Sequence, residues 1–208
     1  MVLPDYLPPV VGFLAGSIPF GLLVAKAKGV DIRKQGSGNI GATNVFRVVG
    51  RPYGIAVFVL DFLKGLGPVL LAAAATTSGA ALGIATGLAA ILGHNYSPWV
   101  GFKGGKGIAT SAGVLAGLFP LALAIGLLVW GIAFTATRYV SVASMGAAAA
   151  IPATEIIRAA LTGKWESSSL VFTVIVAALA IWRHRSNIRN LRAGTEHRFT
   201  RKSTAPKK

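Results

Sequence analysis

The chain has 208 residues, of which 53% are hydrophobic and only 13% are charged, and its mean hydropathy is +0.64. That composition excludes an ordinary soluble domain, and the absence of cysteine excludes disulfides, thiolate catalysis and cysteine-based metal sites. The net charge of +15 does not indicate nucleic acid as a partner, because Lys and Arg cluster beside the ends of apolar runs, where they orient a protein in a membrane.

Seven apolar segments predict an all-α integral membrane protein with seven transmembrane helices. Their approximate bounds, in chain order, are 4–25, 53–76, 80–96, 107–119, 120–137, 139–161 and 167–183. The first lacks the basic start of a cleavable signal, so we expect it to remain in the protein as a span. The two segments that meet at Pro120 are short for a bilayer core about 30 Å thick, so local thinning or shallow placement is expected. Residues 1–197 are expected to form one membrane-embedded domain, and 198–208 a basic, disordered cytoplasmic tail.

The positions of the basic residues predict the orientation of the chain. Polar stretches lie at 27–52 and 94–106, at Arg138 and in the tail from Arg183, and they hold almost all of the 21 Lys and Arg residues. These stretches share one side of the membrane only if 107–137 is crossed twice. A single kinked span there would put the basic tail outside, against the charge bias. We therefore expect the N-terminus outside and the C-terminus in the cytoplasm.

The first polar stretch contains the sequence SGNIGATNVFR, from Ser37 to Arg47. Its glycines tolerate left-handed backbone, Asn39 and Asn44 supply hydrogen-bond donors, and Arg47 offers a planar fork of N–H groups for a phosphate. An ordinary loop ahead of a capped helix is the alternative. The density of these residues favours an anion-binding loop.

The second polar stretch, GFKGGKGIATS, leads into an apolar helix that begins near Ile108. Glycines remove the Cβ atoms that would keep backbone N–H groups away from an anion, and the start of the helix adds positive potential. The stretch is not a Walker A motif, because Val100 and Gly107 stand where that motif needs Gly and Ser or Thr. A flexible loop with orienting lysines is the alternative, but such a loop needs no glycines. The candidate anion ligands are Lys103, Gly104, Gly105, Lys106, Gly107 and Thr110.

Two further stretches bring polar side chains to the same predicted face. RYVSVAS places Ser141 and Ser144 one turn apart at the start of a helix, a pattern that by itself is more typical of a helix interface. HRSNIRNLRAGTE, from His184 to Glu196, puts His184 and Asn187 on one helical face. A basic amphipathic helix lying on lipid headgroups is the alternative, and it accounts for the arginines better than for His184 and Asn187.

Few charges lie inside the apolar segments. Asp61 and Lys64 are three residues apart, so they share a helical face and can neutralise each other. A structural ion pair and a role in ligand binding are both compatible with this spacing.

The motifs that are missing narrow the chemistry. There is no paired-carboxylate constellation, no Asp-x-x-Asp run and only three His, so a metal-dependent lipid synthase is not expected. The G-x-S-x-G nucleophile motif is also absent. A transporter of an organic phosphate would use similar cationic loops, but it should show inverted repeats and broken helices at the membrane midplane. Neither is evident in the sequence, whose polar residues are predicted to crowd one face. A lipid-binding scaffold without enzymatic activity would not need two such dense motifs.

SGNIGATNVFR, GHNYSPWVGFKGGKGIAT and HRSNIRNLRAGTE, in that order, resemble the bacterial glycerol-3-phosphate acyltransferases that use acyl phosphate, the PlsY type. The resemblance covers almost the whole chain. It implies transfer of a fatty acyl group from acyl phosphate to the sn-1 hydroxyl of glycerol 3-phosphate in bacterial phospholipid synthesis, giving lysophosphatidic acid and inorganic phosphate. It implies no cofactor, no metal and no obligate protein partner. The expected partners are the two substrates and the lipid bilayer. The expected location is the bacterial inner (plasma) membrane, crossed several times, with the active site on the cytoplasmic side.

The resemblance also implies a role for each motif residue. The catalytic set, which orients the acceptor hydroxyl, is Ser144, His184 and Asn187. The glycerol-3-phosphate set is Ser37, Asn39, Asn44 and Arg47. The acyl-phosphate set is Lys103, Gly104, Gly105, Lys106, Gly107 and Thr110. Asn190 stands where the family usually has a basic residue, so a phosphate contact at that place would require Arg189 or Arg192, either through a rotation of the local helix or through side chains that reach around it.

Overall fold

The computed structural model describes residues 4–75 and 79–199, and it confirms the all-α fold. The α-helices are α1 (Leu7–Ser17), α2 (Phe20–Ala27), α3 (Ala42–Val48), α4 (Arg51–Ala75), α5 (Gly79–Asn95), α6 (Ile108–Leu118), α7 (Pro120–Thr137), α8 (Val140–Thr162), α9 (Ser167–Arg183) and α10 (Arg185–Arg192). Two 3-10 helices, η1 (Ile32–Lys34) and η2 (Pro98–Val100), lie in the polar loops. Six of the seven predicted apolar segments match single helices to within a few residues.

The first predicted segment, 4–25, is broken into two helices. Ile18 is extended, with φ −61° and ψ 118°, the conformation that a residue before proline prefers, and Pro19 separates α1 from α2. At this break the carbonyl of Ile18 accepts a hydrogen bond of 2.7 Å from Lys64 Nζ on α4. A charged side chain from a neighbouring helix therefore binds the backbone where the first span is interrupted.

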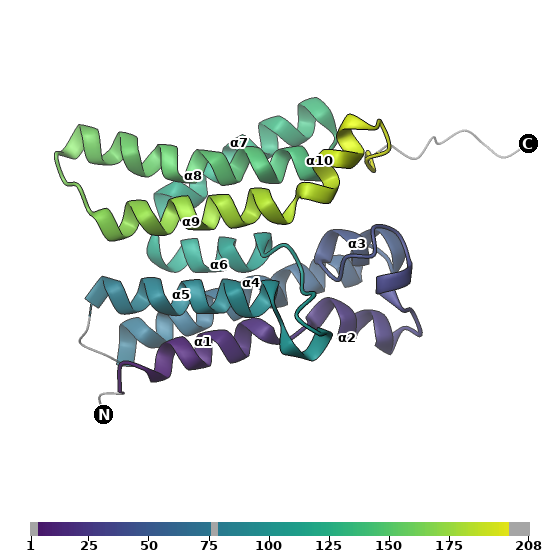
Figure 1. The fold of residues 1–208 in the computed structure, drawn as a ribbon, viewed down its shortest axis with the longest axis horizontal. Coiled ribbons are helices and arrows are strands. Elements are labelled where there is room, and N and C mark those ends of the chain that lie inside the picture. Colours follow the sequence, from purple (N-terminus) through teal and green to yellow (C-terminus); the bar gives the residue numbers. More distant parts are fainter. Residues whose placement is uncertain (1–3, 76–78, 200–208) are drawn as a thin grey trace, which may run out of the picture.

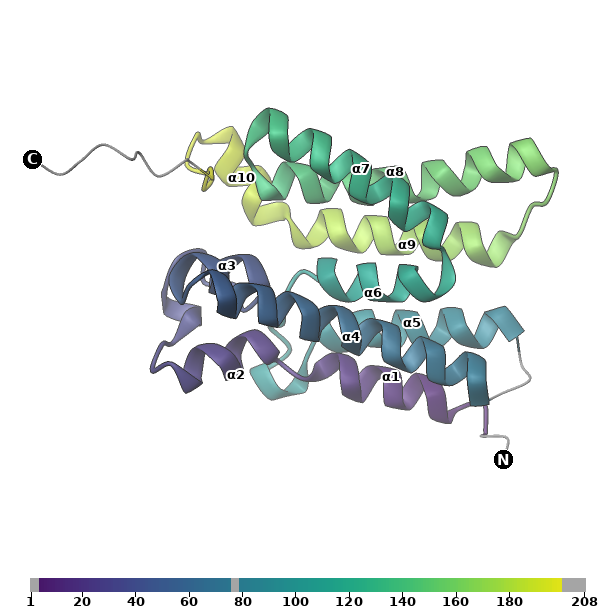
Figure 2. The ribbon, with the colours of Figure 1, turned by 180° about the vertical axis from the view of Figure 1, so that it is seen from behind.

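The long helices form two layers that run side by side (Figure 1). α1, α4 and α5 pack together in one layer, and α8 packs against α7 and α9 in the other. The short helix α6 lies between the layers, as Figure 2 shows from behind, and its Val114 and Leu115 join a buried apolar cluster with Phe172 of α9. Helix α6 approaches α4 so closely that a Cβ at Gly113 would overlap the carbonyl of Phe62. A small residue is thus required where the backbones meet.

Four helical stretches within the described residues are long and apolar enough to cross a membrane on their own: Leu7–Ala27, Arg51–Ala74, Pro120–Thr137 and Val140–Thr162. A fifth span results if α9 and α10 are joined across their bend of 50°. Helix α6 is an apolar helix of only 11 residues. The protein is therefore an all-helical integral membrane protein, and the count of seven spans stays a prediction.

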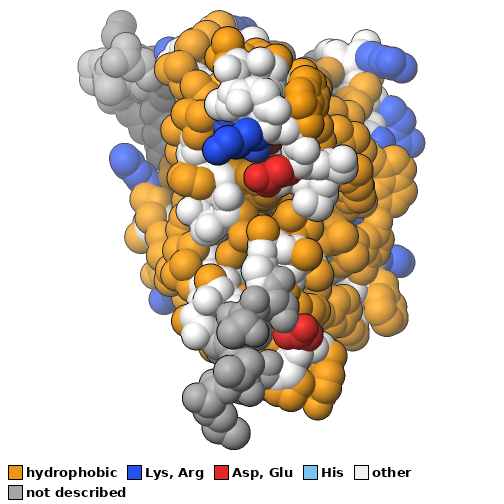
Figure 3. Space-filling model, turned by 90° about the vertical axis from the view of Figure 1, so that its left-hand side faces the viewer, with side chains coloured by type: hydrophobic (Ala, Val, Ile, Leu, Met, Phe, Trp, Pro, Cys, Tyr) orange, Lys and Arg blue, Asp and Glu red, His pale blue; other side chains and the backbone are white. Residues whose placement is uncertain are grey.

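The polar loops meet at one end of the two layers. Figure 1 shows α2, α3, α10 and the loop that precedes α6 at this end, away from the N-terminus. The opposite end, seen face-on in Figure 3, is mostly hydrophobic with few charged side chains. Arg198 and Phe199 belong to the predicted tail, yet they pack on the bundle through hydrogen bonds to the carbonyls of Thr137 and Arg138. The tail from residue 200 onward lies outside the described residues.

Candidate active site

A cavity of about 680 Å³ lies at the polar end, between the two layers. Its wall combines a polar part with an apolar part. The apolar part comes from α4, α6 and α7, through Phe58, Ile108, Ala109, Ala112, Leu127 and Trp130. Because Phe58 and Leu127 are also well exposed, this part of the cavity reaches the outer surface of the bundle. The cavity thus joins a polar recess to a lipid-facing groove.

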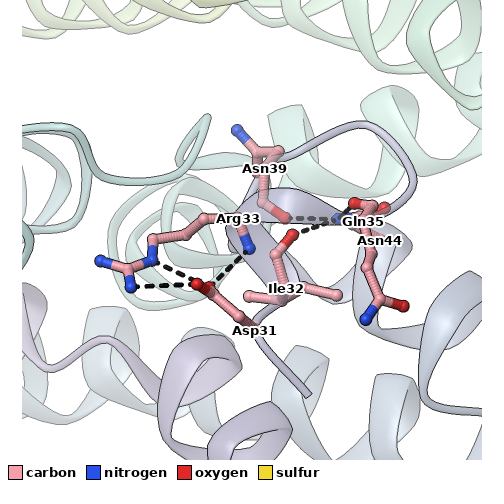
Figure 4. A network of polar contacts seen from close by, with 6 residues as sticks. All are labelled: Asp31, Ile32, Arg33, Gln35, Asn39 and Asn44. Carbon is pink, nitrogen blue, oxygen red and sulfur yellow. Dashed lines mark hydrogen bonds and ion pairs between the residues drawn. The ribbon is translucent and has the colours of Figure 1, made fainter.

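Asn44 organises the first motif from inside (Figure 4). Its amide Nδ2 donates to the carbonyls of Ile32, Gln35 and Asn39 at 3.3, 3.0 and 2.9 Å, and its Oδ1 accepts from the backbone N–H of Ser37 at 2.9 Å. Asn44 is only 2% exposed, so both ends of its amide are used within the loop. The structure therefore gives Asn44 the task of shaping the loop that carries the other predicted ligands.

Three predicted ligands of the first motif remain open to the cavity. Ser37, Asn39 and Arg47 all line it, and Ser37 and Arg47 are exposed. The side chain of Asn39 accepts from the N–H of Gly41 through Oδ1, which leaves its Nδ2 as a donor directed away from Asn44 (Figure 4). The Arg47 guanidinium lies 5.5 Å from the centre of the Phe199 ring. Donors and a positive charge thus face the recess together.

The glycine-rich loop is arranged differently from the prediction of an open nest. The N–H groups of Gly104 and Gly105 donate to the carbonyls of Asn95 and His94 at the end of α5, each at 3.2 Å. A Cβ at Gly104 would overlap the His94 carbonyl, and one at Gly105 the His94 imidazole. These two glycines therefore let the loop press against α5, and their amides are already engaged.

The N–H groups available to an anion belong to the start of α6. The first α-helical hydrogen bond there runs from the N–H of Ser111 to the carbonyl of Gly107 at 2.7 Å, so the N–H groups of the turn before it have no partner within the helix. Gly107 permits this turn because its φ is +79°. Of the six residues predicted to bind acyl phosphate, Lys106 alone lines the cavity. Lys103 is exposed, and Thr110 is fully buried with no hydrogen-bond partner for its hydroxyl.

A chain of hydrogen bonds ties Lys106 to residues far away in the sequence. Lys106 Nζ donates to Asn187 Oδ1 at 2.6 Å, Asn187 Nδ2 donates to Glu196 Oε1 at 2.7 Å, and Ser141 Oγ donates to the same oxygen at 2.7 Å. Burial lowers the pKa of Lys106 to about 8, although the nearby Glu196 carboxylate opposes this shift. Lys106 is therefore mostly protonated at neutral pH, but close to its titration range.

His184 and Ser144 stand beside this chain. Burial, together with the positive charge of Lys106, lowers the pKa of His184 to about 4, so the imidazole is neutral at pH 7. Its Nδ1 lies 2.8 Å from the carbonyl of Ala180, which can only accept, so Nδ1 carries the proton and Nε2 is left with a lone pair. Ser144 Oγ accepts from Trp130 Nε1 at 3.3 Å. Both side chains line the cavity as hydrogen-bonding groups.

Several residues at the site were not among the sequence candidates. Glu196 ends the HRSNIRNLRAGTE motif. Because it is the sole carboxylate in this basic segment, the sequence could have indicated it as a candidate site residue. Arg183 lines the cavity, but in the sequence it resembles any positive residue at the end of a span. Of the basic residues near Asn190, Arg189 lines the cavity. Arg192 is not among the lining residues.

Asp61 and Lys64 form a buried ion pair with an O···N distance of 2.7 Å. Lys64 also holds the break between α1 and α2, and His94 Nδ1 lies 3.7 Å from Asp61 Oδ1. Asp61 and His94 line the cavity, whereas Lys64 is buried behind them. Lys64 therefore supports the wall of the cavity from behind, through its ion pair with Asp61.

The comparisons with known proteins agree on one family. Residues 6–194 match a family model described as glycerol-3-phosphate acyltransferase. A glycerol-3-phosphate acyltransferase of Geotalea daltonii is 51% identical over 91% of this chain and 94% of its own, and one of Aquifex aeolicus is 45% identical over 91% and 96%. The crystal structure of PlsY in its glycerol 3-phosphate form is 42% identical, covers 94% of this chain and 96% of that one, and superposes with a TM-score of 0.87. Its lysophosphatidic acid form has a TM-score of 0.84.

Proposed function

Because the chain belongs to the glycerol-3-phosphate acyltransferase family, as its motifs predicted, we propose that it transfers a fatty acyl group from acyl phosphate to the sn-1 hydroxyl of glycerol 3-phosphate. The hydroxyl oxygen bonds to the acyl carbonyl carbon, and the bond from that carbon to the phosphate oxygen breaks. The hydroxyl proton ends on the phosphate, so the products are lysophosphatidic acid and inorganic phosphate.

The observation that carries this proposal is the two-part cavity. One part presents Arg47, Lys106 and Arg183, which suits two phosphate groups, and the other is an apolar groove that reaches the surface of the bundle. Such a site fits one substrate with a phosphate on a lipid chain and a second, small substrate with its own phosphate. Ser37, Asn39 and Arg47 on one wall supply the donors for glycerol 3-phosphate, with Asn44 holding them in place.

The donor phosphate binds between Lys106 and the free N–H groups at the start of α6, where the helix dipole adds positive potential. The acyl chain lies in the groove lined by Phe58 and Leu127. Phosphate is a good leaving group, so the protein needs chiefly to position the hydroxyl and to stabilise developing charge. This assignment keeps Lys106 and the α6 start as the acyl-phosphate site and gives Gly104 and Gly105 a packing role.

Ser144, His184 and Asn187 orient the acceptor hydroxyl. The neutral imidazole of His184 offers Nε2 as a hydrogen-bond acceptor, and Asn187 links the hydroxyl to Lys106. A phosphate oxygen of a bound substrate takes the proton in this mechanism, which needs neither a metal nor a cofactor. A His184→Gln variant that binds both substrates but has no turnover would argue for His184 as the base instead.

The membrane arrangement that we propose has one domain with seven spans, the N-terminus outside and the C-terminus in the cytoplasm. Its support is that the basic loops gather at a single end of the bundle, where α2, α3 and α10 lie (Figure 1). Helix α6, although short, is packed between the layers, so protein rather than lipid covers much of it. The active site then opens to the cytoplasm at the inner membrane of a bacterium.

Purified protein in lipid, supplied with palmitoyl phosphate, glycerol 3-phosphate and EDTA, tests the proposal. Released phosphate is followed over time and lysophosphatidic acid is identified by mass. Lys106→Ala should abolish most of the activity, whereas Lys103→Ala, which changes an exposed lysine outside the cavity, should retain it. Well-folded wild-type protein that releases no phosphate would refute the acyl-phosphate reaction, and uptake of glycerol 3-phosphate into vesicles would then be measured.

A further inference from the structure

The side chain of Arg183, the last residue of α9, binds backbone carbonyl groups of the glycine-rich loop. Its Nη2 donates to the carbonyl of Gly104 at 2.6 Å and to that of Gly105 at 2.8 Å, and its Nε donates to Gly105 at 3.1 Å. The guanidinium also lies over the Tyr96 ring, 5.6 Å from the ring centre. A single side chain thus covers two consecutive carbonyl groups.

The loop is held from its other side by α5. The same two residues, Gly104 and Gly105, donate their N–H groups to the carbonyls of Asn95 and His94. Helix α5 belongs to one layer of the bundle, and α9, which carries Arg183, belongs to the other (Figure 1). The loop is therefore fixed between the layers, directly before Lys106.

Arg183 also removes an electrostatic obstacle. Backbone carbonyl oxygens carry partial negative charge, so two of them beside a phosphate site would repel the ligand. The guanidinium neutralises both and leaves a net positive charge on the cavity wall. Lysine does not replace it well, because an ammonium is a point donor, whereas the planar fork of arginine reaches two acceptors at once.

We propose that Arg183 is a positioning residue for acyl phosphate. By bridging the carbonyls of Gly104 and Gly105, it holds Lys106 and the start of α6 at the place on the cavity wall where they bind the donor phosphate. This inference rests on the proposed function for its substrate. Its geometric content, that α9 orders the loop through Arg183, holds independently of which phosphate the loop binds.

The kinetic test compares Arg183→Lys and Arg183→Met with the wild type. Both variants should raise the KM for palmitoyl phosphate roughly tenfold, because charged hydrogen bonds are lost, while the KM for glycerol 3-phosphate changes by less than about twofold. Arg51→Lys and Arg51→Met are the matched controls, since Arg51 is exposed and outside the cavity. Full rescue by Arg183→Lys would overturn the proposal, because charge alone would then suffice. Equal rises in both KM values would also overturn it, because they would indicate a general loss of structure.

Hydrogen–deuterium exchange of peptides that cover 103–110 provides a readout that does not depend on activity. In Arg183→Lys the amides of Gly104 and Gly105 should exchange faster than in the wild type, while peptides from α4 keep their protection. Unchanged exchange in the loop would refute the positioning role whatever the kinetics. If wild-type protein does not use acyl phosphate but the loop loosens in the variant, the proposed substrate fails and the structural role of Arg183 stands.

Discussion

Two polar loops contribute residues to the wall of the cavity, and they obtain their order from different sources. In the loop that begins at Ser37, one side chain, Asn44, makes four hydrogen bonds to backbone groups no more than 12 residues away. The loop around Gly104 is held by the end of α5 and by Arg183, which is 79 residues distant from Gly104. Both are rich in glycine and sit before helices. One is a local structure and the other is a product of packing between layers.

The difference teaches where each loop is vulnerable. A locally ordered loop depends on one side chain and can fail without disturbing the rest of the bundle. A loop held between layers depends on both layers keeping their separation, so changes in α5 or α9 reach it. Mutations at the two loops should therefore have separable effects on the two substrates.

The largest effect is expected from Asn44→Ala. It leaves one backbone N–H and three carbonyls without their partner, at about 1 kcal/mol for each hydrogen bond, so we expect a loss on the order of 1,000-fold in kcat/KM for glycerol 3-phosphate. Steady-state kinetics with varied glycerol 3-phosphate measures it. Gln35→Ala is the control, because only the carbonyl of Gln35 contacts Asn44. An equal loss in kcat/KM for palmitoyl phosphate would contradict the expectation that the two loops serve different substrates.

Gly105→Ala tests the other loop, with the next largest effect. Its Cβ would overlap the His94 ring, so the loop must move away from α5, and we expect the KM for palmitoyl phosphate to rise roughly tenfold or more. The same substitution at Gly67 meets no atom within 4 Å and serves as the control. If Gly105→Ala changed the KM for palmitoyl phosphate no more than Gly67→Ala does, the close contact of the loop with α5 would not be needed for binding of the acyl donor.

The pH dependence sharpens the assignment of Lys106 to the donor side. Its pKa of about 8 means that it is charged below this value and loses its charge above it, so the KM for palmitoyl phosphate should rise as the pH increases beyond about 8. Lys106→Arg stays charged and should lose this alkaline limb, even if its activity is lower. The pKa of His184, about 4, predicts no acidic limb from this residue above pH 5. An alkaline limb confined to the KM for glycerol 3-phosphate would assign Lys106 to the acceptor instead.

The smallest effect is expected from Phe199→Ala. The Phe199 ring lies 5.9 Å from Phe46 and 5.8 Å from Phe134, measured between ring centres, and the Arg47 guanidinium stands over it, so it joins α3 to α7. Its removal should raise the KM for glycerol 3-phosphate about threefold, in line with roughly 0.5–1 kcal/mol for an exposed cation–π contact. Phe102→Ala, at an exposed loop position, is the control. No change in the KM would show that Arg47 keeps its place without the ring.

The amino-acid sequence by itself determined the class of protein, the helices and the family. Apolar runs and prolines are local signals, so the boundaries near Pro120 and the polar loops could be predicted from residues close in the chain. The break at Pro19 was missed because the apolar run continues across it, although the proline itself was a usable signal. The three motifs also predicted Ser37, Lys106 and His184 as site residues, and the structure brings these three to one cavity.

Only the tertiary structure decided which of the motif residues keep free hydrogen-bonding groups at that cavity. Asn44 and Gly105 have the residue types of ligands, but their hydrogen-bonding groups are taken up inside the protein. Arg183 and Glu196 gained their partners across 78 and 55 residues, because the two layers bring α9 and the segment after α10 against other elements. Such pairings depend on how the helices pack, and a spacing pattern along the chain carries no information about the distance between layers.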